Sequence, residues 1–208
     1  MVLWFIYFIL ALVTSVLCYL TNWLVVLFAD DNGELPGPLK LWQTWDNSLD
    51  CSDSVFVAPR FLQYNWEAHY REYKGTNEYL WSVNRERWYS ECTDTNFTVK
   101  ELLQRYACRV LWLYRNNAYG WAFYMLGLNV SPRLSISQSE HTLLVKEVFD
   151  QGMYGAWMYK NTAPIFQVGK YILHWNNLLG WKIDTSATVD TRAMVAIRIA
   201  FYIETEAD

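Results

Sequence analysis

The first 28 residues of the chain carry no charged side chain. Leucine, valine, isoleucine and aromatic residues make up most of this run, from Met1 to Phe28. About 20 predominantly apolar residues are enough for a helix to cross a bilayer. The run therefore predicts a transmembrane anchor at residues 1–28, and the rest of the chain must fold beside it or beyond it.

Two alternatives to an uncleaved anchor remain open, a cleaved signal peptide and a buried core helix. A signal peptide has basic residues before its apolar stretch and small residues at its cleavage site. Here the first Lys or Arg is Lys40, and no Ala-x-Ala sequence follows the run. The sequence favours the uncleaved anchor over both alternatives.

Aromatic residues make up 18% of the chain, with 12 Trp and 15 Tyr. Tryptophan and tyrosine are enriched where a protein meets the edge of a membrane. We expect four aromatic side chains at this interface: Trp4, Tyr19, Trp23 and Trp42. Trp42 lies in a short amphipathic piece of the juxtamembrane segment 29–59, and packing of this piece on the folded domain is an equally open alternative.

The formal net charge is −4, and acidic residues alternate with the basic ones. This pattern lacks the basic stripe of a nucleic-acid-binding protein, so we expect no nucleic-acid partner. The four cysteines stand singly, without Cys-x-x-Cys pairs or clustered histidines, which argues against a metal site. A disulfide between Cys51 and Cys92 remains open, although free thiols are favoured.

Residues 60–128 are predicted to be mainly helical. The mixed aromatic and charged stretch at 60–95 suggests two short helices separated by Gly75-Thr76-Asn77. A capping box of Thr98 and Glu101 then predicts the start of a longer helix. One apolar face follows at helical spacing, formed by Val99, Leu102, Leu103, Tyr106, Val110, Leu113 and Tyr114. Another face carries Glu101, Arg105, Cys108, Arg109 and Trp112, with Glu101 and Arg105 as a supportive i,i+4 pair. Residues Asn116, Asn117 and Gly120 tolerate the left-handed backbone that ends a helix.

Residues 129–208 alternate apolar and polar side chains, which predicts four to six antiparallel strands. Two of the expected strands, Met153–Tyr159 and Pro164–Trp175, are joined by a connection at residues 160–163. The predicted fold class is therefore α+β: a single N-terminal transmembrane helix, a helical segment, and a C-terminal antiparallel β-meander. Residues 60–208 form one domain in this interpretation.

The sequence contains no pairing of a nucleophile with a base and no cluster of metal ligands, so we assign no catalytic residue and no cofactor, and we do not expect an enzyme. Arginine side chains can bind phosphate groups through two parallel hydrogen bonds. The candidate functional surface consists of Asp46, Arg105, Arg109, Arg115, Asn116, Tyr119, Gly120 and Lys182. A purely structural role explains the same residues.

Four motifs occur in a distinctive order along the chain. They are Gly33-Glu34-Leu35-Pro36, the segment from Trp42 to Asp50 (Trp-Gln-Thr-Trp-Asp-Asn-Ser-Leu-Asp), the segment from Arg109 to Gly120 (Arg-Val-Leu-Trp-Leu-Tyr-Arg-Asn-Asn-Ala-Tyr-Gly), and Leu179-Gly180-Trp181-Lys182. In this order the chain resembles a family of uncharacterised small membrane-anchored proteins of tailed bacteriophages and prophages. It departs from that family at Trp45 and Asn117, where the family tends to have proline, and residues 64–95 look like an enlargement. The resemblance implies a membrane location and a phage origin, but no reaction, cofactor or catalytic residue.

Together these observations suggest a phage-encoded, single-pass protein of the host inner membrane. Its expected partners are membrane lipids and an unidentified host or phage protein. The positive-inside rule counts Lys and Arg close to the span and finds only Lys40 there. Because the N-terminal tail is negligible and the basic residues lie downstream, a cytoplasmic C-terminal domain is favoured. The alternatives are an envelope- or lipid-directed enzyme, and a structural component of the virion.

Overall fold

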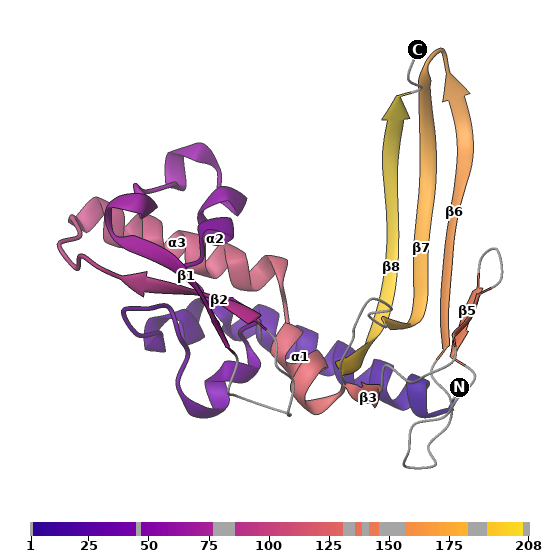
Figure 1. Cartoon of the computed structure of the whole chain (residues 1–208), viewed down its shortest axis with the longest axis horizontal. Coiled ribbons are helices and arrows are strands. Elements are labelled where there is room, and N and C mark those ends of the chain that lie inside the picture. Colours follow the sequence, from indigo (N-terminus) through magenta and orange to yellow (C-terminus); the bar gives the residue numbers. More distant parts are fainter. Residues whose placement is uncertain are drawn as a thin grey trace. The chain divides into compact units, whose positions relative to one another are not determined.

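A computed structural model of the chain describes residues 2–44, 47–76, 86–130, 136–138, 142–145, 157–182 and 191–205 (Figure 1). The chain divides into two compact units. One, the helical unit, comprises Leu10–Met125; the other, the sheet unit, comprises Met1–Ile9 and Leu126–Asp208. Asp46 of the candidate surface lies outside the described residues.

The chain begins with one long apolar helix, α1 (Val2–Val25), which continues into the 3₁₀ turn η1 (Val26–Phe28). The stretch Leu3–Phe28 has a mean hydropathy of 2.3 and is long and apolar enough to cross a membrane. Both a membrane anchor and a signal sequence have these properties. The predicted long apolar N-terminal helix is thus confirmed as an element.

Short turns and helices connect α1 to the rest of the helical unit. They are η2 (Gly37–Leu41), α2 (Ser52–Val57), η3 (Arg60–Leu62) and η4 (Trp66–Ala68). The Asp30 carboxylate folds the first connection, because its Oδ1 accepts the backbone N–H groups of Asn32 and Glu34 at 2.9 and 2.8 Å. An aspartate that bonds backbone groups a few residues on is a common way to hold a turn.

The prediction of two short helices in residues 60–95 is wrong. Beyond η4 the chain forms the antiparallel hairpin β1 (Tyr70–Thr76) and β2 (Glu86–Cys92). Arg71 lies directly opposite Glu91, and the two side chains form an ion pair at 2.5 Å. Such cross-strand partners stabilise a sheet, and they are not visible in the local periodicity of either segment.

The predicted capping box opens helix α3 (Val99–Arg115) and is confirmed. The Thr98 hydroxyl accepts the N–H of Glu101 at 3.2 Å, and the Glu101 carboxylate accepts the N–H of Thr98 at 2.9 Å. The two faces of α3 nevertheless have unexpected environments. The buried residues are Arg105, Cys108, Arg109, Trp112 and Leu113. Three members of the predicted apolar face, Val99, Leu102 and Leu103, are exposed instead.

Helix α3 ends in a turn at Asn116, Asn117 and Ala118. The residue with left-handed backbone is Ala118, at φ 57°, rather than either asparagine or Gly120. A π-helical turn, η5 (Trp121–Met125), follows. Gly120 is required for another reason: a Cβ atom there would lie 2.6 Å from the carbonyl oxygens of Leu41 and Gln43.

The sheet unit contains one six-stranded antiparallel sheet, in the order β3-β8-β7-β6-β5-β4. Its strands are β3 (Leu128–Val130), β4 (Ile136–Gln138), β5 (Thr142–Val145), β6 (Trp157–Val168), β7 (Tyr171–Lys182) and β8 (Thr191–Thr205). Strands β4 to β8 are neighbours in chain order, as a meander requires, and β3 pairs with the outer edge of β8. The predicted α+β class with a C-terminal antiparallel meander is confirmed.

One predicted connection in the meander is wrong. Residues 160–163 lie inside β6, and the chain turns instead at Gly169 and Lys170. Gly169 has φ 57°, which suits a tight hairpin turn. Pro164, which lacks a backbone N–H, is tolerated because the register with β7 shifts between Pro164 and Phe166.

Candidate functional site

The most concentrated polar chemistry in the helical unit surrounds one buried carboxylate, that of Asp50, which is 1% exposed. Arg109 donates from Nε to Asp50 Oδ1 at 2.8 Å, and its Nη2 donates to Asp50 Oδ2. Arg105 Nη2 and the Tyr70 hydroxyl also donate to Oδ2, at 3.1 and 2.9 Å. We call Asp50, Arg105, Arg109 and Tyr70 the Asp50 cluster.

The arginines of the Asp50 cluster also hold the turn that follows α1. Arg109 Nη2 donates to the carbonyl oxygen of Asp30 at 2.8 Å, and Arg105 Nη2 donates to that of Asp31 at 2.9 Å. Gly33 in this turn has φ 72°, and a Cβ atom there would lie 2.8 Å from Asp50 Oδ2. The cluster therefore fastens the turn, the Asp50 segment and α3 together.

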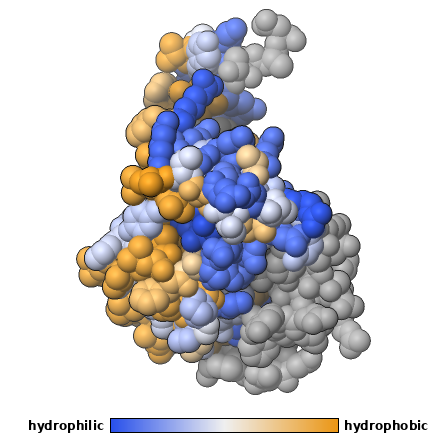
Figure 2. Space-filling view, turned by 90° about the vertical axis from the view of Figure 1, so that its left-hand side faces the viewer, coloured by the Kyte–Doolittle hydropathy of each residue, from blue (hydrophilic) through white to orange (hydrophobic). Residues whose placement is uncertain are grey.

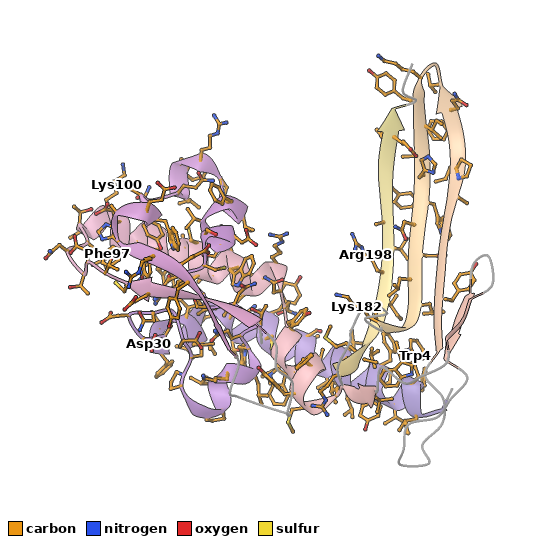
Figure 3. The ribbon with its side chains drawn as sticks, in the orientation of Figure 1. Trp4, Asp30, Phe97, Lys100, Lys182 and Arg198 are labelled. Carbon is orange, nitrogen blue, oxygen red and sulfur yellow. The ribbon has the colours of Figure 1, made fainter. Side chains whose placement is uncertain are left out.

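Aromatic rings pack against the Arg105 guanidinium of the Asp50 cluster. The Arg105 guanidinium lies 4.7 Å from the ring centre of Phe97 and 5.5 Å from that of Tyr70. Phe97 in turn stacks on the buried His69 at 4.0 Å, and His69 Nε2 lies 3.4 Å from Glu101 Oε1. In Figure 3, Asp30 and Phe97 are both labelled in the helical unit.

Electrostatics keeps the Asp50 carboxylate charged. Burial alone would raise the pKa of Asp50, but the hydrogen bonds and attraction of Arg109, with a further contribution from Arg105, outweigh it and lower the pKa. The pKa of the Tyr70 hydroxyl is raised by burial and then by the Asp50 charge. A buried carboxylate that is ionised and paired in this way is suited to holding structure rather than to transferring protons.

A second polar contact joins α1 to the turn after α3. Asn22, buried on α1, donates from Nδ2 to Asn117 Oδ1 at 3.1 Å. Asn117 Nδ2 in turn donates to the carbonyl oxygen of Ser15 at 2.9 Å. Cys18, which lies between these two positions on α1, is completely buried. We call this contact the asparagine clamp.

The cysteines are free in the structure. Burial raises the pKa of Cys51 to about 12 and that of Cys108 to about 11. Burial also raises the pKa of Cys92. Thiols that stay protonated at neutral pH are weak nucleophiles.

The structure brings together only part of the predicted functional surface. Arg105 and Arg109 lie inside the helical unit, in the Asp50 cluster. Arg115 is exposed at the end of α3, with its guanidinium 5.6 Å from the Trp112 ring centre, and Asn116 caps the helix by donating to the Trp112 carbonyl at 3.2 Å. Tyr119 is half-buried in the turn that follows. Lys182 is exposed at the end of β7, in the sheet unit (Figure 3).

The predicted interfacial aromatics also have different environments. Tyr19 and Trp23 are exposed on α1. Trp42 packs on the helical unit, donating to the Thr21 hydroxyl at 2.9 Å and contacting the Trp121 ring edge-on at 5.5 Å. In the sheet unit, the Trp4 indole donates to the Gly180 carbonyl at 2.9 Å. For Trp42, packing on the domain is the alternative that the structure supports.

Sequence reasoning missed Asp50 and Asn22. A signal for Asp50 existed: Arg105 and Arg109 share a helical stripe with Cys108 and Trp112, and a charged pair on a stripe with buried residues requires a counter-charge. A signal for Asn22 existed as well, because it is an amide in an otherwise apolar run.

The structure defines an α+β protein with one long, exposed apolar helix and a buried ion-pair cluster. The chain belongs to a family of unknown function, DUF7338, whose model matches residues 1–206. No curated protein and no solved structure matches it.

Proposed function

We propose that this protein is a non-enzymatic interaction protein held at a membrane by α1. The observation that carries the proposal is the exposure of apolar side chains along this helix, including Leu12, Val16 and Leu20. Exposed apolar surface of this extent is a contact surface for lipid or for another protein. The resemblance to membrane-anchored proteins of tailed bacteriophages and prophages supports a phage origin and a place at the host inner membrane.

Support for a non-enzymatic role comes from the Asp50 cluster. Arg105 and Arg109 were the best candidates for gripping the phosphate of a lipid or envelope substrate. Their guanidinium groups instead donate to the Asp50 carboxylate and to the Asp30 and Asp31 carbonyl oxygens. An envelope- or lipid-directed enzyme therefore has less support than a protein that binds lipids and an unidentified host or phage protein.

Cell fractionation tests membrane attachment. The full chain with a C-terminal tag is expressed in bacteria, and we expect it in the inner-membrane fraction with an intact N-terminus and release only by detergent. The matched variant Leu12→Glu/Leu20→Glu places charges on the exposed face of α1 and is expected to shift protein to the soluble fraction. A mature N-terminus located after residue 28 would show that α1 is a signal sequence and would overturn the proposal.

Crosslinking followed by detergent pull-down from phage-infected cells tests the interaction role. We expect a reproducible host or phage protein that is absent with an unrelated membrane protein as bait. Repeated recovery of no partner would contradict this role, and detection of the chain in purified particles would favour the virion alternative. A separate experiment tests orientation. If the C-terminal domain is cytoplasmic, the C-terminal tag should be protected from protease added to intact spheroplasts.

A further inference from the structure

Helix α1 does not present its whole circumference to its surroundings. Within the helical unit, Cys18, Asn22 and Val25 are buried and recur at helical spacing, so they form one stripe. Val25 belongs to the core cluster that contains Leu35, Leu49, Trp112 and Leu113. The side chains of this stripe therefore face the interior of the helical unit.

Helix α3 lies along α1 in the opposite direction. The Tyr106 hydroxyl donates to the Trp23 carbonyl at 2.8 Å, and the Tyr114 hydroxyl donates to the Tyr19 carbonyl at 3.1 Å. The asparagine clamp continues this order, because Asn117 reaches the Ser15 carbonyl. Later residues of α3 and of the turn after it therefore contact earlier residues of α1.

This pairing puts polar structure beside the middle of the apolar stretch Leu3–Phe28. Ser15 is close to the midpoint of that stretch, and the turn with left-handed Ala118 lies next to it. Arg115, which lies between Tyr114 and Asn117 in the chain, is exposed. A helix that crossed the bilayer would carry an exposed guanidinium and an irregular turn near the bilayer centre, where charges and non-helical backbone are disfavoured.

The opposite face of α1, and of the turn η1 that continues it, carries exposed apolar side chains. Val13, Leu20 and Leu27, spaced seven residues apart, are 60%, 68% and 62% exposed. Residues seven apart lie on nearly the same side of a helix. Figure 2, which faces the helical unit, shows apolar residues gathered on one side of this unit.

The exposed apolar surface does not stop at α1. Val99 and Leu103 both lie on α3, before Tyr106, whose hydroxyl donates to the Trp23 carbonyl of α1. Val99 is about two turns before Tyr106, and Leu103 is about one turn before it. Both side chains are exposed. A second helix of the unit thus also carries exposed apolar side chains, which an anchor that simply crosses the bilayer would not require.

We propose that α1 lies along the membrane surface, with the face marked by Val13, Leu20 and Leu27 sunk among lipid headgroups and the upper acyl chains, rather than crossing the bilayer. The proposal rests on membrane attachment as the proposed function. An in-plane helix buries its apolar face to about 5–10 Å and keeps its other face on the protein. The single-pass arrangement expected from the sequence is replaced by a one-sided anchor.

Spin labels on the exposed face of α1 and η1 distinguish an in-plane helix from a helix that crosses the bilayer. Val13→Cys, Leu20→Cys and Leu27→Cys are made singly in the full chain, reconstituted in vesicles of phosphatidylethanolamine and phosphatidylglycerol, and their depths are read by power saturation. The wild-type chain measures the background labelling, which is subtracted: Cys18, Cys51 and Cys108 are buried, whereas Cys92 is partly exposed. Leu103→Cys reports on α3.

An in-plane helix predicts similar shallow depths at the two α1 positions and at Leu27 of η1, and lipid contact at Leu103. A spanning helix predicts depths that differ by about 10 Å between successive labels, because seven residues rise about 10 Å. That graded profile on membrane-bound protein would overturn the in-plane arrangement alone. Labels shielded from both lipid and water would show a second copy on this face and would also overturn it, whereas failure of the wild-type chain to bind vesicles would contradict the proposed function itself.

Discussion

Different interactions stabilise the inside of the helical unit and the inside of the sheet unit. The helical unit buries charged and amide side chains, and these bond to segments distant in the chain: Asp50 to Arg105 and Arg109, and Asn22 to Asn117. In the described part of the sheet unit, the strands are joined mainly through their backbone ladders, and many apolar side chains of β6, β7 and β8 are exposed.

Substitutions should therefore have different effects on stability in the two units. A buried charge that loses its partner is penalised strongly, because the remaining charge stays away from water. An exposed side chain on a strand contributes mostly through its neighbours on the same face. Single substitutions should therefore affect the helical unit much more than the exposed face of the sheet.

The largest effect is expected at the centre of the Asp50 cluster. Asp50→Asn keeps the side-chain volume but leaves two buried guanidinium groups without a counter-charge, and the free energy of unfolding should fall by about 3–5 kcal/mol. Denaturant unfolding in detergent, followed by circular dichroism, measures the change. The control Asp53→Asn removes an exposed carboxylate of α2 and should have little effect. Equal stability of the two variants would refute a central role for the cluster.

The same carboxylate predicts a dependence on pH. The pKa of Asp50 is lower in the folded protein than in the unfolded chain, where it is about 3.9. Its stabilising contribution is therefore complete above the unfolded pKa and is lost as the pH falls through the folded pKa. Unfolding of the wild-type chain at a series of pH values below about 4 should show this loss, and Asp50→Asn should lack that component.

A smaller effect is expected at Gly120. The added methyl group of Gly120→Ala would press against the carbonyl oxygens of Leu41 and Gln43, and overpacking of this kind destabilises by about 1–3 kcal/mol. The wild-type chain is the comparison, because the open glycines Gly37 and Gly169 have positive φ and would be strained by any side chain. If Gly120→Ala unfolds at the same denaturant concentration as the wild type, steric contact is not the reason for Gly120.

The asparagine clamp should contribute less again. Asn117→Ala removes the hydrogen bonds to Asn22 and Ser15, and we expect a loss of about 1–2 kcal/mol. A double-mutant cycle with Asn22→Ala measures the coupling between the two amides. Strictly additive losses would mean that the two side chains do not interact in solution.

The smallest effect is expected on the sheet. Ile199 is exposed on β8, and Ile199→Thr keeps a β-branched side chain. For both reasons the free energy of unfolding should change by no more than about 0.5 kcal/mol. Thermal unfolding of this variant beside Asp50→Asn compares the two units directly. A large loss at Ile199 would show that this face of the sheet is covered in solution.

Several elements could be predicted because their signals are local. The uncharged run at the N-terminus, the capping box of Thr98 and Glu101, and the alternation along β8 each act within a few residues. The hairpin β1–β2 could not be predicted in the same way, because its strands are stabilised across the pairing, as by Arg71 and Glu91.

The candidate site shows the same limit. The sequence placed Arg105 and Arg109 on the candidate functional surface, but it could not assign them a partner. Asp50 stands 55 residues before Arg105, and no spacing rule connects the two.

The long apolar helix α1, the start of α3 and the antiparallel meander follow from hydrophobic periodicity and local capping in the sequence. Which face of α3 is buried, and which face of α1 is exposed, depends instead on contacts between distant segments. A buried charge requires a counter-charge from elsewhere in the chain. Asp50 supplies it, and so turns the arginine face of α3 inward and leaves Val99 and Leu103 outside.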